Sequence, residues 1–231
     1  MNRLLKFLIG LALLPFAFAF IFNFMAVVWE IVKNFNLTFP FLTGFALYCF
    51  LHRYVYNFSR PYVLAHETSH AFAALCCGYK VSDIKVKEES GHTKVSDFNT
   101  FVLLAPYCLP LYAVISIIVF YITSLFWKDI LAYNTIFLGV LGFFMALHLV
   151  HTFKTLTETK QSDISLAGGG VFSFVLIAVI NLSLLILLIN FLFPTLVAPM
   201  PLLKEVIAQT ILFWKLFFIY LHKGIVWIFD L

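Results

Sequence analysis

The stretch SRPYVLAHETSHAFAALCCG, residues 59–78, is an apolar segment with three ionisable side chains near its centre, and the fold has to accommodate it. Ser59 can cap free backbone N–H groups at a helix start, and Pro61 suits the first helical turn. Gly78 is typical of a C-terminal stop. The helix between them has about 17 residues and a length of roughly 25 Å, so it is barely long enough to cross a bilayer.

Two histidines and a glutamate in this helix form the pattern H-E-x-x-H. His66 and His70 are four residues apart, so both imidazoles project from one face of the helix. This spacing allows two ring nitrogens to bind one Zn²⁺ at about 2.0–2.1 Å. Glu67 does not share that face squarely, but its carboxylate can reach a metal-bound water and act as a general base. The alternative is a pair of interface histidines, with Glu67 hydrogen-bonded to a neighbouring helix.

The rest of the chain is strongly apolar: of its 231 residues, 63% are hydrophobic and 11% are charged. Soluble domains carry about 25% charged residues, and runs near the roughly 20 apolar residues that cross a bilayer recur here. We therefore predict an all-α, multi-pass protein embedded in a lipid bilayer. The net charge of +4 is scattered, so no nucleic-acid partner is expected. The four cysteines lack C-x-x-C spacing and are expected to be free thiols.

The apolar runs predict about six transmembrane or re-entrant helices. The N-terminal run begins like a signal peptide, but it continues far beyond a core of about 7–15 residues, which favours an uncleaved first span. The last run carries several charged residues, so it could lie in the membrane interface instead of crossing. The expected spans or re-entrant helices cover residues 8–32, 41–56, 61–77, 101–127, 130–153 and 171–192, and the last, membrane or interfacial, helix covers residues 203–229.

A polar stretch, YKVSDIKVKEESGHTKVSDF at residues 79–98, follows the H-E-x-x-H helix. Polar and apolar side chains alternate over residues 82–87, which is typical of a short strand. The sequence EESG makes a plausible turn into a second strand around residues 92–95. We expect these two strands to pair as a small β-hairpin. An ordinary polar loop is the alternative.

Four motifs along the chain are HETSHAFAALCCGYKV (66–81), SGHT (90–93), APYCLP (105–110) and QSDISLAGG (161–169). Together they resemble the site-2-protease-type intramembrane zinc metallopeptidases, and most closely the compact branch without a PDZ domain. The resemblance implies a zinc ion held by His66, His70 and Asp163, with Glu67 as the general base. It also implies that the substrate is a membrane protein.

The position of Asp163 leaves alternatives open, because this residue could simply cap the helix that follows it. If the segments that begin at residues 61, 101 and 130 all cross fully, Asp163 emerges on the side opposite His66. One segment must then be re-entrant or broken, or Asp163 must dip into the bilayer. The short H-E-x-x-H helix and the region of Pro106 and Pro110 are the expected places. Failing these, the candidates to complete the site are Asp129, His148 and His151.

Three parts are expected along the chain: an N-terminal transmembrane hairpin (1–58), a metallopeptidase membrane core (59–193) and a C-terminal membrane or interfacial helix (194–231). The expected function is hydrolysis of a peptide bond in or near a transmembrane segment of the substrate, in the cell (inner) membrane. The alternative is a non-catalytic membrane protein, either a metal-binding transporter or an inactive protease-like scaffold. Glu67 separates the two, because a transporter needs ligands but no base. The oligomeric state stays open.

Overall fold

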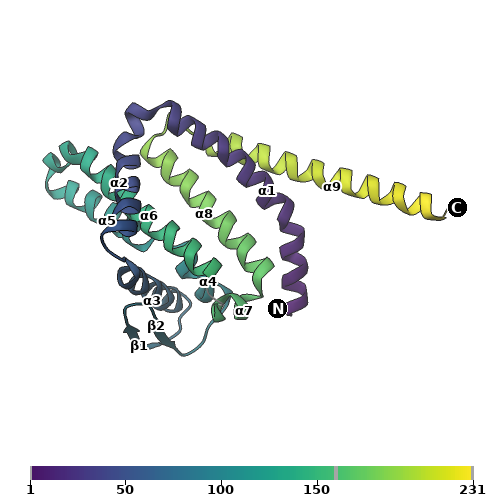
Figure 1. Ribbon diagram of the computed structural model, residues 1–231, viewed down its shortest axis with the longest axis horizontal. Helices are drawn as coiled ribbons and strands as arrows, with labels where there is room; N and C mark the ends of the chain where they lie inside the picture. The colour runs from purple at the N-terminus through teal and green to yellow at the C-terminus, as the bar shows by residue number, and fades with distance from the viewer. Residues whose placement is uncertain (1, 159–160, 230–231) are drawn as a thin grey trace. The chain divides into compact units, whose positions relative to one another are not determined.

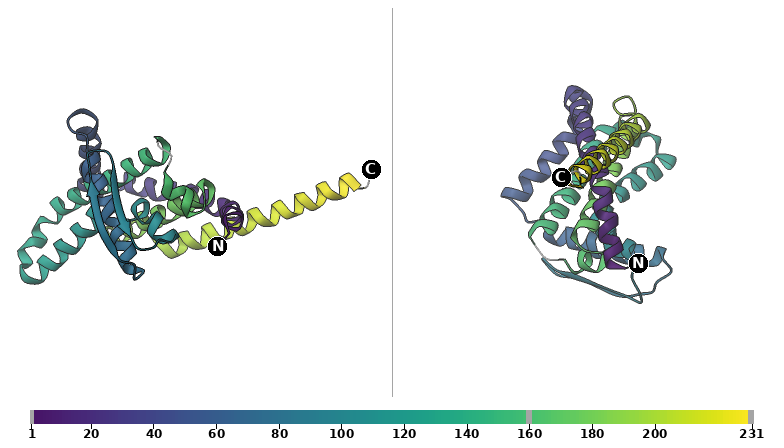
Figure 2. Two further views of the ribbon diagram at one scale, coloured as in Figure 1. Left: turned by 90° about the horizontal axis from the view of Figure 1, so that it is seen from below. Right: turned by 90° about the vertical axis from the view of Figure 1, so that its right-hand side faces the viewer.

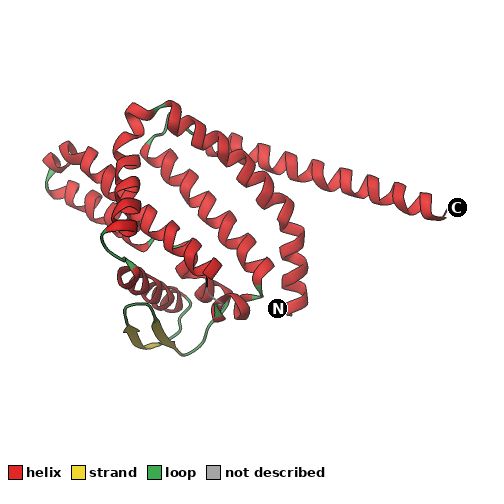
Figure 3. Cartoon of the chain, in the orientation of Figure 1, coloured by secondary structure: helices red, strands yellow, loops and turns green. Residues whose placement is uncertain are grey.

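The computed structural model describes residues 2–158 and 161–229, and nearly all of its regular structure is helical (Figures 1 and 3). The chain divides into two compact units, one made of residues 1–34 and 171–231 and the other of residues 35–170. The predicted all-α architecture is confirmed. The expected functional division at residues 58 and 193 stays a prediction.

The first unit contains three long helices: α1 (Arg3–Lys33), α8 (Gly170–Leu192) and α9 (Pro199–Phe229). The side-chain amide of Asn23 on α1 donates to Oε1 of Gln209 on α9 at 2.9 Å, so a polar group within an apolar helix has a partner. A Cβ on Gly10 would lie 2.8 Å from the Cα of Phe172. Glycine at residue 10 therefore allows the backbones of α1 and α8 to approach closely.

The second unit is built around the pairing of α2 (Phe35–Tyr54) with α6 (Asn134–Glu158), which lie side by side. Glycines make this approach possible. A Cβ on Gly44 would overlap the carbonyl of Gly139, and a Cβ on Gly142 would overlap the carbonyl of Phe41. Small residues at such interfaces are typical of membrane helices, whose association depends on close packing.

Four described helical stretches are long and apolar enough to cross a membrane: α1, α2, Lys128–Glu158 and α8. A fifth is α4 (Thr100–Cys108) joined to α5 (Leu111–Phe126), if this pair, bent by 72°, counts as one span. The break is at Pro110, which lacks the N–H that would continue the helix. A short 3₁₀ helix, η1 (Lys128–Tyr133), leads into α6. The chain is thus a multi-pass membrane protein, and the predicted broken segment is confirmed.

The H-E-x-x-H helix is α3 (Ser59–Cys76), which is not among these candidate spans. It ends as expected before Gly78, whose φ of +75° is in the left-handed region that favours glycine. The predicted hairpin follows, with β1 (Val81–Val86) antiparallel to β2 (Gly91–Val95) (Figure 2). Both strands pack against α3. The short helix α7 (Ser162–Ala167) packs against α4 and precedes α8.

Candidate metal centre

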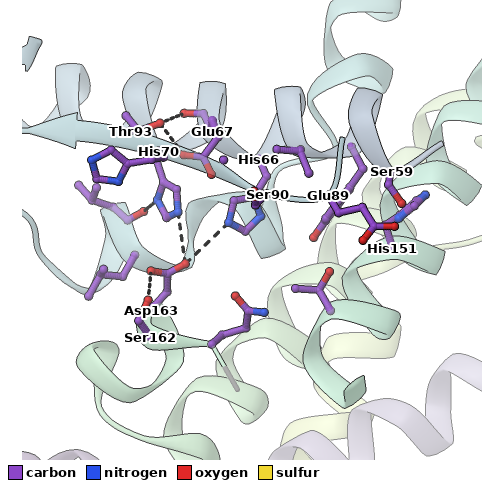
Figure 4. A pocket seen from close by; sticks show the side chains of 18 of the residues that line it. Ser59, His66, Glu67, His70, Glu89, Ser90, Thr93, His151, Ser162 and Asp163 are labelled. Atoms are coloured by element: carbon purple, nitrogen blue, oxygen red, sulfur yellow. Dashed lines mark hydrogen bonds and ion pairs between the residues drawn. The ribbon is translucent and has the colours of Figure 1, made fainter. Parts of the chain in front are cut away.

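Three potential metal ligands meet at one point, two from α3 and one from the first turn of α7 (Figure 4). Nε2 of His66 lies 3.7 Å from Oδ2 of Asp163, and Nε2 of His70 lies 3.3 Å from the same oxygen. One ligand atom from each residue lies within 4.8 Å of the others. Two ligands of a tetrahedral zinc ion are about 3.3 Å apart, so these separations are close to those of a metal site.

The bend between α4 and α5 explains how Asp163 reaches the two histidines. A straight span from residue 100 to residue 126 would carry the chain fully across the bilayer. Instead, the helices are bent by 72°, and α7 packs against α4. The bent pair α4 and α5, together with α3, which is not among the candidate spans, removes the assumption of full crossings that placed Asp163 opposite His66.

His70 is oriented by the main chain of α4. Its Nδ1 lies 2.8 Å from the carbonyl oxygen of Val102, so Nδ1–H donates and Nε2 is the nitrogen that faces Asp163. That carbonyl would normally accept from the N–H four residues later, but residue 106 is proline and has none. Pro106 therefore leaves the Val102 carbonyl without its helical donor and available to His70. Metal-binding histidines are usually fixed by such a bond from their other nitrogen.

Asp163 has a third partner, Tyr107, which is fully buried in α4. The Tyr107 hydroxyl donates to Oδ2 of Asp163 at 3.2 Å. Burial favours the protonated carboxyl, but the hydrogen bonds and positive charge of His66 and His70 outweigh it and hold the pKa of Asp163 below its usual range. Asp163 is thus a carboxylate, the form that binds metals. Helix capping alone does not account for these contacts.

Glu67 lies on the neighbouring face of α3 and is 6% exposed. Its carboxylate contacts strand β2, where the hydroxyl of Thr93 lies 2.7 Å from Oε2 and 3.0 Å from the main-chain oxygen of Glu67. A Cβ on Gly91 would lie 2.5 Å from Oε1 of Glu67. Gly91 and Thr93 belong to the SGHT motif, but no individual role could be predicted for them, because their contact with α3 arises only when the hairpin folds back.

The alternative ligands do not join this cluster, although His151 lines the same cavity. Among the described residues, the group of His, Cys, Asp and Glu that could hold a metal contains only the three residues above. His151 on α6 stacks on the ring of Tyr62, with centroids 4.8 Å apart. His148 is buried on the same helix, and Asp129 belongs to η1. The structure therefore brings together His66, His70 and Asp163. None of the alternative ligands belongs to this cluster.

A cavity of about 670 Å³ opens over the cluster. It is lined by α3, by the hairpin, and by the end of α6 with the start of α7, and it contains His66, Glu67, His70 and Asp163. Polar side chains such as His92 and Gln161 contribute to its wall. An extended peptide segment laid along β2 would thus pass beside Glu67 and the ligand cluster.

The donor set suits a zinc ion. Two imidazoles and one carboxylate, with a fourth position open to the cavity, are the ligands of many catalytic zinc sites. His70 is fixed through both of its nitrogens. Nδ1 of His66 is buried and has no hydrogen-bond partner within the described part of the chain, so this ring is held less firmly than that of His70.

The fold and the cluster define a class: a multi-pass membrane protein that presents H-E-x-x-H and an aspartate to a polar cavity. The model of the Peptidase M50B-like family matches residues 40–211, and the chain belongs to that family. This confirms the resemblance to the site-2-protease type and assigns the chain to a family of peptidases. No curated protein and no solved structure matches the chain significantly.

Proposed function

We propose that this protein is a zinc-dependent intramembrane endopeptidase that hydrolyses a peptide bond in or near a transmembrane segment of another membrane protein. The observation that carries the proposal is the approach of the Asp163 carboxylate to both histidines of the H-E-x-x-H helix, at 3.3 and 3.7 Å. Residues 161–169 are far from the helix in sequence. Their convergence supports a built ligand set over a chance pattern.

His66, His70 and Asp163 would hold the ion. When bound, a zinc ion lowers the pKa of a coordinated water toward about 7 and polarises a carbonyl. Glu67 takes a proton from the attacking water as the new C–O bond forms, and it passes that proton to the nitrogen of the leaving amine as the C–N bond breaks. The products are one carboxylate and one amine.

The hairpin supplies the means to bind an unwound substrate. A helix shields its own peptide bonds, so a membrane substrate must be extended before it can be cleaved. The free edge of the two-stranded sheet offers main-chain partners to such a segment. The cell membrane is the proposed location, and its lipid bilayer would present the substrate laterally.

Replacement of Glu67 by glutamine tests the proposal. Purified protein is incubated with a single-span model peptide that carries a fluorophore and a quencher on either side of its apolar segment. Glu67→Gln should lower cleavage about 10²–10⁴-fold, the usual contribution of a general base, while bound zinc measured by mass spectrometry stays equal to wild type.

Glu88→Gln is the matched control, because Glu88 is exposed on the hairpin, 3.5 Å from Arg60, and does not line the cavity. It should cleave like wild type. Cleavage by the Glu67→Gln variant at the wild-type rate would overturn the proposal that this protein is a hydrolase. Zinc transport into vesicles that is unaffected by Glu67→Gln would favour the transporter instead.

A further inference from the structure

Strand β2 lies directly against Glu67, and two of its residues contact the carboxylate. Thr93 is half-buried, and its hydroxyl approaches both Oε2 and the main-chain oxygen of Glu67. The side chain of Glu67 therefore meets the hairpin at its carboxylate, its most mobile end.

Gly91 completes this contact. A Cβ at residue 91 would lie 2.5 Å from Oε1 and 2.7 Å from Cδ of Glu67, and it would also overlap Cγ. Any side chain larger than hydrogen would thus displace the Glu67 carboxylate. The absence of a side chain at Gly91 and the hydroxyl of Thr93 together determine which rotamer of Glu67 fits.

We propose that β2 positions the general base: Thr93 holds one oxygen of Glu67, and Gly91 leaves the space that this rotamer needs. The inference rests on the proposed function, because it assigns Thr93 as a positioning residue for that chemistry. Glutamate has three rotatable side-chain bonds, so an unrestrained carboxylate samples many positions away from the attacking water. Holding a catalytic group in its productive geometry is a major part of enzymatic rate enhancement.

A threonine hydroxyl suits this task because it both donates and accepts hydrogen bonds. It can donate to Oε2 of the carboxylate. When Glu67 carries the proton of the attacking water, the same hydroxyl can accept from Oε2 and donate to the main-chain oxygen of Glu67, 3.0 Å away. The contact therefore persists through the cycle.

The hairpin does not need the Thr93 hydroxyl for its own pairing. The main-chain ladder joins Ile84 to Thr93 and Lys85 to His92, and a separate hydroxyl, that of Ser82, donates to the oxygen of Lys94 at 3.3 Å. Ser82 thus offers a matched control: a hairpin hydroxyl with a main-chain partner and no contact with Glu67.

The test compares Thr93→Val, Thr93→Ser and Ser82→Ala in the full-length protein, with the model peptide substrate described above. Valine matches threonine in shape and lacks the hydroxyl, whereas serine keeps it. Thr93→Val should lower kcat about 10–100-fold, the usual effect of removing a partner that orients a site residue, with KM within about twofold and zinc content unchanged. Thr93→Ser should recover most of kcat, and Ser82→Ala should equal wild type.

A readout independent of cleavage is the thermal double-mutant cycle of Thr93→Val with Glu67→Met, which keeps the length of the side chain and removes both carboxylate oxygens. If the two side chains are bonded, their effects on apparent Tm are non-additive, whereas unconnected residues give additive effects. The cycle detects the contact whether or not the preparation cleaves peptide.

The outcomes separate the two proposals. Wild-type kcat for Thr93→Val, alongside loss of cleavage in Glu67→Gln, would overturn the positioning role and leave the proposed function intact. A rise in KM alone would instead assign Thr93 to substrate binding. Equal cleavage by wild type and Glu67→Gln would overturn the proposed function, and with it the catalytic meaning of the contact.

Discussion

The second unit contains two histidine pairs of nearly the same ring geometry. The rings of His66 and His70 have centroids 4.9 Å apart and planes at 80°, and those of His52 and His151 have centroids 4.8 Å apart and planes at 62°. The first pair faces Asp163. The second pair is stacked between aromatic rings, with Tyr48 on His52 and Tyr62 on His151.

The difference shows that histidine spacing alone does not make a candidate metal site. A divalent ion in a low-dielectric interior needs opposite charge. Within the described part of the chain, an ion pair with a carboxylate is found at the first pair and not at the second. In the second pair, Nδ1 of His52 and Nε2 of His151 are buried without hydrogen-bond partners among the described residues. Its neighbours are rings, which pack but do not compensate the charge of a metal.

Removal of the histidines should have the largest effect and tests the comparison directly. His66→Ala and His70→Ala should each weaken zinc binding by more than the about 10–100-fold typical of outer partners, because each removes a ligand. His52→Ala and His151→Ala should leave zinc affinity unchanged. Competition with a chromogenic chelator, in detergent at neutral pH, gives the affinities of all four variants.

Equal losses in both pairs would contradict this contrast and place a metal, or a coupling between the pairs, in the aromatic cluster. No loss in either pair would remove the metal centre altogether.

Replacement of Asp163 should cause the second-largest loss of zinc affinity, because Asp163 supplies the negative charge that distinguishes the first pair. Asp163→Ala should weaken zinc binding on the order of 100-fold, above most outer-partner effects. Asp163→Asn, which keeps the shape and loses the charge, should be nearly as weak, whereas Asp129→Asn on η1 should bind like wild type. Unchanged zinc retention in Asp163→Ala would place the third ligand elsewhere.

The features of the fold and of the candidate site that depend on local sequence patterns could be predicted from the sequence. Hydropathy predicted the apolar helices, and Gly78 predicted the end of α3. The four-residue spacing of His66 and His70 predicted a shared helix face. Each of these depends on residues within one or two helical turns, where physical chemistry acts without the tertiary fold.

What the sequence left open depends on contacts between distant segments. Topology was ambiguous because hydropathy cannot tell a span bent at Pro110 from a straight one. Tyr107 and Thr93 gained roles only through partners more than 20 residues away in the chain. The pairing of His52 with His151, from α2 and α6, has no local signal at all.

A smaller effect is expected on thermal stability, when a histidine of the second pair is replaced. His151→Phe keeps an aromatic ring against Tyr62 and removes a buried nitrogen that has no described partner. Because an unsatisfied buried polar atom is destabilising by about 1–3 kcal/mol, apparent Tm should stay equal or rise by a few degrees, roughly 2–4 °C per kcal/mol at this chain length. A clear fall in Tm, measured by nanoscale fluorimetry in detergent, would show that this nitrogen has a partner such as water.

The smallest expected effect concerns Pro106, which leaves the Val102 carbonyl available to accept a hydrogen bond from His70 of the first pair. Alanine at residue 106 would restore an N–H that donates to the Val102 carbonyl and competes with Nδ1–H of His70. Since a carbonyl oxygen has two lone pairs, both donors can share it at poorer geometry, and zinc affinity should fall a few-fold, below the about 10–100-fold of losing an outer partner. Pro15→Ala is the matched control, because it also restores an N–H inside a long helix, α1, which belongs to the first unit and contributes nothing to the ligand cluster. If Pro106→Ala binds zinc as tightly as Pro15→Ala, the proline serves only the backbone of α4. If it alone weakens binding, the orientation of His70 depends on a hydrogen bond that the helix does not make.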